Sequence, residues 1–347
     1  MALLARWRRL AAALTLALCG FAAQSAAAQS DAVADFYRGR NLVLMTGNAA
    51  GGGYDLYLRL LAEHLGRHVP GRPNIIVENK GGAGGLVAMN YIYNVAPKDG
   101  SIMIMPFNYD PVFQLLRPDQ AKYDLRQMIW LVNMAEITSV IGVTSEAGVR
   151  SIEEARSREV VMASSGQSSE SYIIPTLLNA TIGTQFKVVT GYPGAAGMFL
   201  SMERGETGGR VGSWYSFKLA FPERIREGRI VVLAQDGLRR HQELPNVRLY
   251  QELAGDADSR QMIALMSYPG ILARTLAFPP GVPADRVAAI RQALAETLRD
   301  GAFLAAAEKA YLEIKPGTPR EIEDVLDRLF ATPPALVART KTILGWK

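Results

Sequence analysis

The chain has few of the side chains that usually form disulfides, bind metals or carry out covalent catalysis. It has one cysteine, Cys19, and a single cysteine cannot form a disulfide within the chain. Its three histidines, His64, His68 and His241, do not combine with acidic residues at the spacing of a metal site. His64 and His68 are four residues apart but lack the H-E-x-x-H frame of a zinc enzyme, so we interpret them as part of a solvated helix face. We expect no metal and no cofactor.

A strong excess of one charge sign is also missing. The chain has 38 basic and 33 acidic residues, but residues 1–28 contain three arginines and no acid. Without that segment, 35 basic residues stand against 33 acidic ones. A chain this close to neutrality gives no reason to expect a nucleic acid or an anionic membrane as partner.

The N-terminal segment has the layout of a secretory signal. Three arginines precede an apolar stretch over residues 10–23, and alanines at 26–28 provide small residues for cleavage. The apolar stretch is too short to span a bilayer. A lipoprotein signal is disfavoured because Leu18, rather than a small residue, precedes Cys19. We predict a signal peptide over residues 1–28 and a mature chain that is exported to the periplasm, soluble and free of disulfides.

Membrane-spanning runs and nucleotide-binding motifs are absent from the rest of the sequence. The apolar stretch 262–278 is broken by Pro269 and Arg274. A P-loop needs Gly-Lys-Ser/Thr after its glycines, whereas Gly53 is followed by Tyr-Asp. The dinucleotide fingerprint fails at Val87, where it requires glycine or alanine. Because no G-x-S-x-G elbow is present either, no reactive group is visible and we do not expect an enzyme.

The sequence does contain an alternation of strand and helix patterns. Its first part reads β-α-β-α-β, with a glycine-rich loop after each of the first two strands, which predicts a parallel sheet. The expected strands are 41–45, 74–78 and 101–105, and the expected helices are 55–68 and 86–94. Further strands are expected over 138–143, 160–163, 186–189, 211–214 and 230–233. A helix follows Ser151, another ends near Leu298, and Thr318 caps a last one.

Small residues gather in four loops, each after a predicted strand and before a predicted helix. In the first, Gly47–Gly53, a glycine-rich turn can present backbone N–H groups at a helix N-terminus to a phosphate or a carboxylate. Several such loops could hold an anion without arginine or lysine. Simpler roles remain open: the glycines can permit a tight turn, Asp55 can be a first-turn acid, serines 164–169 can cap a helix, and Trp214 can belong to the core.

Three segments in this order resemble the extracytoplasmic solute receptors of the tripartite tricarboxylate transporter family, the Bug receptors. Residues 50–61, AGGGYDLYLRLL, are similar to the family's A-G-G-x-x-D-x-x-A-R-L-L. Residues 77–85, VENKGGAGG, are similar to V-E-N-R-P-G-A-G-G, and residues 96–100, APKDG, to A-x-P-D-G. The serine–glycine loop at 163–168 resembles that of the family's second lobe. The resemblance extends from about residue 35 to residue 344.

The resemblance implies an α/β fold of the class II periplasmic-binding-protein type, with two lobes joined by a two-stranded hinge. The first lobe would comprise residues 35–133 and 268–347, and the second residues 134–267. In such receptors the glycine loops hold a ligand carboxylate. Carried over, the first lobe contributes Gly47, Asn48, Ala49, Gly51, Gly52, Tyr54, Asp55, Ala83 and Gly84. The second lobe contributes Ser164, Ser165, Gln167, Ser168, Tyr192, Gly194 and Trp214.

The sequence departs from the family pattern near this site. The family's Pro-Thr before the aspartate is Gly53-Tyr54, and the usual serine or threonine after Gly194 is Ala195. The acids of the second-lobe pattern V-D-x-x-F-D are absent from residues 211–216. We expect from these changes a ligand without an amine that is bulkier or more apolar.

The resemblance implies a monomeric binding protein that captures a small organic carboxylate and hands it to the membrane subunits of a tripartite transporter. A receptor of the same fold that serves a signalling partner is the alternative, and an enzyme built on this scaffold is third. The identity of the carboxylate stays open at this point.

Overall fold

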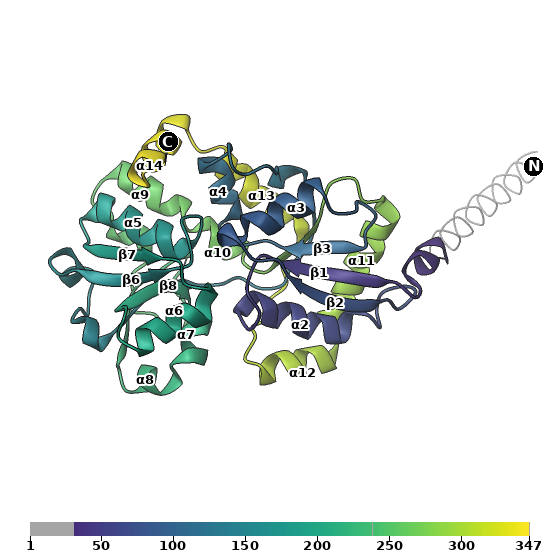
Figure 1. The fold of residues 1–347 in the computed structure, drawn as a ribbon, viewed down its shortest axis with the longest axis horizontal. Coiled ribbons are helices and arrows are strands. Elements are labelled where there is room, and N and C mark those ends of the chain that lie inside the picture. Colours follow the sequence, from purple (N-terminus) through teal and green to yellow (C-terminus); the bar gives the residue numbers. More distant parts are fainter. Residues whose placement is uncertain (1–30, 238, 347) are drawn as a thin grey trace, which may run out of the picture.

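The computed structural model describes residues 31–237 and 239–346, and it forms two α/β lobes side by side (Figure 1). Each lobe has one five-stranded sheet with helices on both faces. This arrangement confirms the predicted fold class. The expected signal peptide at residues 1–28 lies outside the described residues.

The sheet of the first lobe has the strand order β2-β1-β3-β10-β4. Strands β1, β2 and β3 are parallel, whereas β10 runs antiparallel to both of its neighbours. Their bounds are β1 Asn41–Thr46, β2 Asn74–Asn79, β3 Ile102–Met105, β10 Thr275–Phe278 and β4 Ile129–Asn133. Sequence reading predicted the three parallel strands and missed β4 and β10.

The sheet of the second lobe has the order β7-β6-β8-β5-β9, and its β5 is antiparallel to both neighbours. The parallel strands are β6, β7 and β8. The bounds are β5 Ser139–Thr144, β6 Val160–Ser164, β7 Phe186–Thr190, β8 Gly209–Ser213 and β9 Ile230–Gln235. The two sheets therefore share one pattern, in which the antiparallel fourth strand is attached to a segment that crosses between the lobes.

Alternating side chains of the first sheet belong to two cores. Leu44 faces α2 (Gly53–Leu65), α11 (Ala284–Thr297) and α12 (Gly301–Lys309). Met45 faces α3 (Leu86–Asn94), α4 (Asp110–Leu116) and α13 (Pro319–Phe330). Successive residues of a strand point to opposite faces of the sheet. A sheet that is covered by helices on both faces therefore needs strands in which consecutive residues are apolar. The predicted apolar face of α2, formed by Leu58, Leu61 and Leu65, is fully buried.

The second lobe carries α5 (Glu170–Ile182) and α9 (Ala257–Leu265) on one side of its sheet. On the other side lie α6 (Gly194–Glu203), α7 (Trp214–Ala220) and α8 (Pro222–Arg226). The helix expected after Ser151 is only a short 3-10 helix, Glu154–Arg156. The helix capped by Thr318 is α13, as predicted, but it is not the last, because α14 (Pro334–Ile343) follows. Helix α14 packs against α4 of the first lobe and against α5 and α9 of the second.

The chain crosses between the lobes in two segments that bind each other. One segment, residues 134–138, leads from β4 to β5, and the other leads through α10 (Tyr268–Ile271) to β10. The amide of Met134 donates to the carbonyl of Arg274 at 2.8 Å, and the amide of Ile137 donates to the carbonyl of Gly270 at 2.9 Å. These two bonds connect the crossing segments, although residues 134–138 are irregular and the other segment contains the helix α10 where the resemblance implied a strand.

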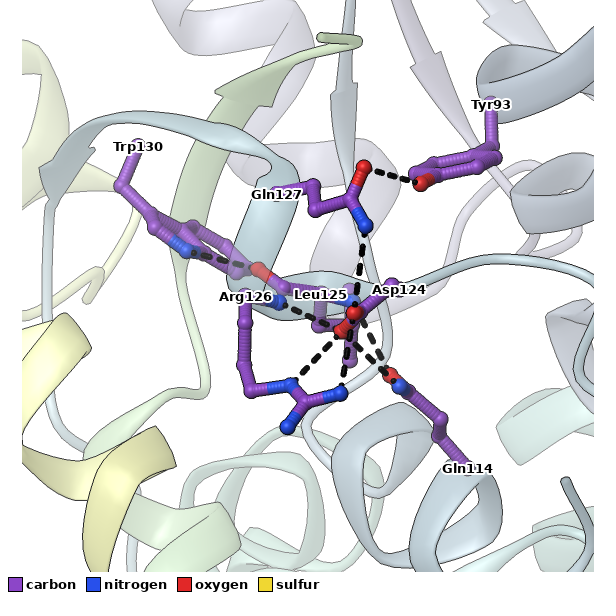
Figure 2. Close-up of polar contacts among 7 residues, drawn as sticks. All are labelled: Tyr93, Gln114, Asp124, Leu125, Arg126, Gln127 and Trp130. Atoms are coloured by element: carbon purple, nitrogen blue, oxygen red, sulfur yellow. Dashed lines mark hydrogen bonds and ion pairs between the residues drawn. The ribbon is translucent and has the colours of Figure 1, made fainter. Parts of the chain in front are cut away.

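A polar cluster fixes the entry into β4 (Figure 2). Asp124 caps the 3-10 helix Leu125–Gln127, because its carboxylate accepts from the amide of Arg126 at 3.1 Å and also from the Arg126 guanidinium. Gln114 of α4 donates to the same carboxylate at 3.1 Å. The indole of Trp130 donates to the carbonyl of Leu125 at 3.2 Å. The cluster ties α4 to the start of β4, which is an edge strand of the first sheet.

Candidate functional site

A cavity of about 100 Å³ lies between the two lobes. Its walls are formed by residues that follow β1, β3, β6 and β7, together with residues of β8, so it lies where ligands bind in open α/β sheets. The first lobe and the crossing segments contribute Asn48, Gly53, Tyr54, Phe107, Asn108, Tyr109, Ile137 and Arg274. The second lobe contributes Ser139, Ser165, Ser168, Ser169, Glu170, Ser171, Gly194, Ala195, Met198, Arg210, Val211, Ser213 and Ser216.

Three helices begin at this cavity without a capping side chain. They are α2 at Gly53, α5 at Glu170 and α6 at Gly194. In each of them, the side chain of the residue before the helix accepts no hydrogen bond from the backbone N–H groups of the first turn. The first N–H groups of a helix have no partner inside the helix and carry the positive end of its dipole. Three such ends around one cavity favour a negatively charged occupant.

The first glycine loop uses much of its own hydrogen-bonding capacity. The amide of Gly51 donates to Asp55 Oδ2 at 2.8 Å, and Arg59 donates to the same oxygen at 2.8 Å. The amide of Ala49 donates to Asn48 Oδ1 at 3.0 Å. Asp55 is thus a first-turn acid that holds the loop, which is the simpler of the two roles left open for it. Of the nine first-lobe candidates, only Asn48 and Tyr54 line the cavity.

Tyr54 is fixed in the cavity wall by a reciprocal pair of hydrogen bonds. Its hydroxyl donates to Asn108 Oδ1 at 2.9 Å and accepts from the amide of Asn108 at 3.1 Å. Its ring packs edge-on against Phe107, with centroids 4.9 Å apart. Burial raises the pKa of Tyr54 to about 12, so the hydroxyl stays neutral. Tyr54, the aromatic residue by which this sequence departs from the family pattern, therefore forms part of a rigid cavity wall.

The second glycine loop meets the serine loop at the edge of the cavity. Ser168 Oγ donates to the carbonyl of Ala83 at 2.8 Å. A Cβ at Gly84 would lie 2.0 Å from Ser168 Oγ, so the two loops approach as closely as glycine allows. At a second point of approach, a Cβ at Gly194 would lie 3.5 Å from Asn48 Oδ1. The lobes are therefore in contact around the cavity.

The remaining second-lobe candidates occupy different places. Ser164 accepts a bond from the hydroxyl of Ser171 at 3.2 Å inside the serine loop, and Ser165 and Ser168 line the cavity. Gln167 is exposed, and Tyr192 donates its amide to the carbonyl of Ser164 at 3.2 Å. Neither lines the cavity.

Trp214 lies away from the cavity, at the start of α7 rather than at the end of a strand. Its indole donates to Glu243 at 2.6 Å and borders a wider hollow of about 810 Å³ that also touches the crossing segments. Among its charged residues, Lys218 pairs with Glu243, Arg240 with Glu252 and Lys315 with Glu136.

Three charged residues of the cavity were not predicted: Arg210, Glu170 and Arg274. Arg210 belongs to β8, Glu170 opens α5, and Arg274 immediately precedes β10. Sequence analysis indicated that the loops could hold an anion without arginine or lysine, but two arginines line the cavity. The sequence contained a hint for each arginine. Arg210 stands between glycines in a short strand, and Arg274 is a lone cation in an apolar run.

The acid of the cavity is Glu170, whose Oε2 accepts from Ser139 Oγ at 2.6 Å. Burial raises the pKa of Glu170, although Ser139, Arg210 and Arg274 act against the shift. Burial lowers the pKa of Arg210 to about 10, which leaves it charged at neutral pH. The charge balance of the cavity is therefore positive, in agreement with the three helix N-termini.

Across residues 31–237 and 239–346, no group of histidine, cysteine and acidic side chains is arranged to hold a metal ion. In the same part of the chain, no helix has the length and apolar character needed to cross a membrane.

Comparison with known proteins identifies the family whose model the chain matches and the solved structures that share its fold. The model of the family described as "Tripartite tricarboxylate transporter family receptor" matches residues 58–318. A Cupriavidus necator protein named "UPF0065 protein in gbd 5'region" is 26% identical over 249 residues, which is 70% of this chain and 71% of that one.

Several solved structures share the fold at low identity. The periplasmic binding protein BugD is 18% identical, with a TM-score of 0.68 over 88% of this chain and 98% of its own. An R. palustris protein solved with adipate is 19% identical, with a TM-score of 0.67 over 88% and 98%. MatC from Rhodopseudomonas palustris, solved with bound malate, is 19% identical, with a TM-score of 0.66 over 88% and 99%.

Proposed function

Because the chain belongs to the tripartite tricarboxylate transporter receptor family, we propose that it is a periplasmic solute receptor that captures a small organic carboxylate between its lobes. The closed complex then delivers the solute, as a monomer, to the membrane subunits of a tripartite transporter. The observation that carries this proposal is the cavity itself, where two arginines and three uncapped helix N-termini surround one small space.

A carboxylate suits this space for physical reasons. Its charge is stabilised by the guanidinium groups and by the helix dipoles, and its oxygens accept the N–H groups that the helices leave open. Two proteins of this fold have been solved with the carboxylates malate and adipate, which supports the same class of ligand here. The family is one of receptors, so we expect binding and release of the acid rather than turnover.

Capture requires the lobes to separate and close again. The crossing segments can serve as the hinge, because they carry the chain between the lobes and, in the described residues, are connected by two backbone bonds, from Met134 and Ile137. Closure brings Ser168 to Ala83 and buries the ligand between both walls. The liganded and empty forms then differ in shape, which allows membrane subunits to recognise the loaded receptor.

The direct test is thermal unfolding and calorimetry of the chain from residue 29 onward against mono-, di- and tricarboxylates, aromatic acids and amino acids. At about 100 times its Kd, a ligand should stabilise the fold by about 2.7 kcal/mol. We expect at least one carboxylate to bind, with no chemical change detected by mass spectrometry. Turnover of a bound acid, or no response to any carboxylate, would contradict the proposal.

Two further measurements address location and partner. Cell fractionation and mass spectrometry of the exported protein should find it in the periplasm, starting near residue 29. Proteoliposomes that contain the tripartite membrane subunits should take up the carboxylate only when the receptor is added. If uptake stays at zero while the liganded receptor binds a sensor protein, the receptor serves signalling instead.

A further inference from the structure

Arg210 is a buried cation for which the described part of the chain provides no hydrogen-bond acceptor. Its side chain is 4% exposed, and its Nε and Nη1 have no hydrogen-bond acceptor. The guanidinium lies over the ring of Phe199, 4.5 Å from its centroid, and 5.7 Å from that of Phe217. A Cβ at Gly212 would lie 2.1 Å from Nη2, so glycine at this position makes room for the arginine. Burying a charge with open N–H groups is costly, and a ligand can offset that cost.

Arg274 is a second buried cation with an open N–H group. It is 3% exposed, and its Nε has no acceptor. Its Nη1 donates only to the carbonyl of the preceding residue, Ala273, at 2.8 Å. The guanidinium lies 4.1 Å from the ring centroid of Tyr54, and Nη2 would lie 3.0 Å from a Cβ at Gly53. The charge is thus held at the N-terminus of α2 by aromatic rings and not by an acid.

Neither arginine is paired with a carboxylate in the described part of the chain, where the ion pairs within 4.0 Å involve other residues. The acid that shares the cavity is Glu170, and its Oε2 is bound to Ser139 Oγ at 2.6 Å. Two guanidinium groups therefore remain available to one occupant.

The two cations belong to different halves of the site. Arg210 projects from β8 of the second sheet, and Arg274 stands at the entrance to β10 of the first sheet. A ligand with one acidic group leaves one of them desolvated and unpaired, whereas a ligand with an acidic group at each end satisfies both. The cavity of about 100 Å³ restricts the distance between the two groups to a few carbon atoms.

We infer that Arg210 and Arg274 determine specificity by each binding one acidic group of a short diacid, which bridges the lobes. The inference rests on the proposed function and makes it narrower: the ligand is a small dianion, and its two charges are recognised by side chains rather than by loop amides alone.

Calorimetry with matched acids tests this inference. The probes are oxalate, malonate, succinate and glutarate, each compared with its monoamide, which keeps the shape and removes one charge. We expect one diacid to bind at least about tenfold more tightly than its monoamide, as charged hydrogen bonds in a buried site allow. Arg210→Gln and Arg274→Gln should each remove that preference, while Arg210→Lys should keep part of it.

Arg224→Gln is the matched control. Arg224 is also partly buried in the second lobe and lies over an aromatic ring, 5.4 Å from the centroid of Phe221, but it pairs with Glu146 outside the cavity. This variant should retain the full diacid preference. Circular dichroism and melting curves show whether each variant is folded. If Arg274→Gln is not folded, Arg210→Gln alone tests the inference.

The outcomes separate the two proposals. Equal binding of diacid and monoamide, or an unchanged preference in Arg210→Gln, overturns the diacid inference and leaves the receptor function standing. Binding of another carboxylate with no response to the four diacids does the same. Failure of every carboxylate to bind the wild-type protein removes both proposals.

Discussion

Ser168 Oγ in the second lobe donates a 2.8 Å hydrogen bond to the carbonyl oxygen of Ala83 in the first lobe, directly beside Gly84. A Cβ at Gly84 would lie 2.0 Å from the Ser168 hydroxyl, so this contact between the lobes needs glycine at residue 84. In the proposed closing motion, closure therefore depends on Gly84 although this residue does not line the cavity.

Gly84→Ala should weaken ligand binding by opening the closed form. Gly84 has φ +68°, so alanine there costs about 1–2 kcal/mol of backbone strain in addition to the clash. Gly183→Ala is the control, because Gly183 has φ +76° and open space around its Cβ. We expect both variants to lose similar stability, but only Gly84→Ala to lose at least tenfold in affinity for the tightest-binding acid. Equal affinities in the two variants would rule out this role for the contact.

The affinity for an anion should rise as the pH falls through the pKa of Glu170. Burial raises that pKa, and protonation removes a negative charge that competes with the ligand for Arg210 and Arg274. A short disulfonate, which stays ionised throughout, should bind up to about tenfold more tightly per pH unit while the carboxyl titrates. Glu170→Gln should bind with little dependence on pH. A pH profile shared by the variant would assign the effect to another group.

Asp236→Asn should stabilise the protein at neutral pH. Asp236 is fully buried, its Oδ1 accepts from the amide of Ser139 at 2.5 Å, and its Oδ2 has no partner. Burial raises its pKa well above the ordinary value, so the folded state holds the proton that the unfolded state releases. The stability that depends on this proton is complete below the unfolded pKa and is lost as the pH rises through the folded pKa.

Denaturant unfolding at several pH values tests this sign. We expect Asp236→Asn to gain about 1–3 kcal/mol over the wild-type protein near pH 8, the cost of one unsatisfied buried group, and to gain least at acidic pH. A constant difference over the whole range would mean that the carboxyl does not titrate in the folded state.

Asp124→Ala should destabilise the first lobe without changing ligand affinity. The side chain caps a 3-10 helix and binds Arg126 and Gln114, so its loss should cost about 1–2 kcal/mol. Burial acts to raise the pKa of Asp124, but the bonds from Arg126 and Gln114 lower it overall, so its contribution is present at neutral pH and is lost as the pH falls. Asp119→Ala, which removes the ion pair of an exposed carboxylate with Arg117, should destabilise the protein less than Asp124→Ala does.

The sequence predicted most of what is local and little of what is brought together from a distance. The parallel strands and the apolar face of α2 were found because their periodicity and turn residues lie within about 15 positions. Strands β4 and β10 were missed, since short apolar segments that pair across more than 100 residues carry no periodic signal of their own.

The same limit applies to the cavity. Its loops were predicted from glycine and serine motifs, but Arg210, Glu170 and Arg274 come from a strand, a helix start and a crossing segment. Only the fold places them around one space. The family pattern could not indicate these three residues either, because the second-lobe pattern was compared at residues 211–216, where the family has acids.

The strand order also has a consequence for the sequence of folding events. The second sheet is continuous, because all five of its strands lie between Ser139 and Gln235. The first sheet lacks β10 between β3 and β4 until Thr275–Phe278 has emerged, and its helices α11 to α13 come later still. As the chain emerges from its N-terminus, the middle of the chain can therefore fold before the first lobe, whose early strands must wait for a partner without aggregating.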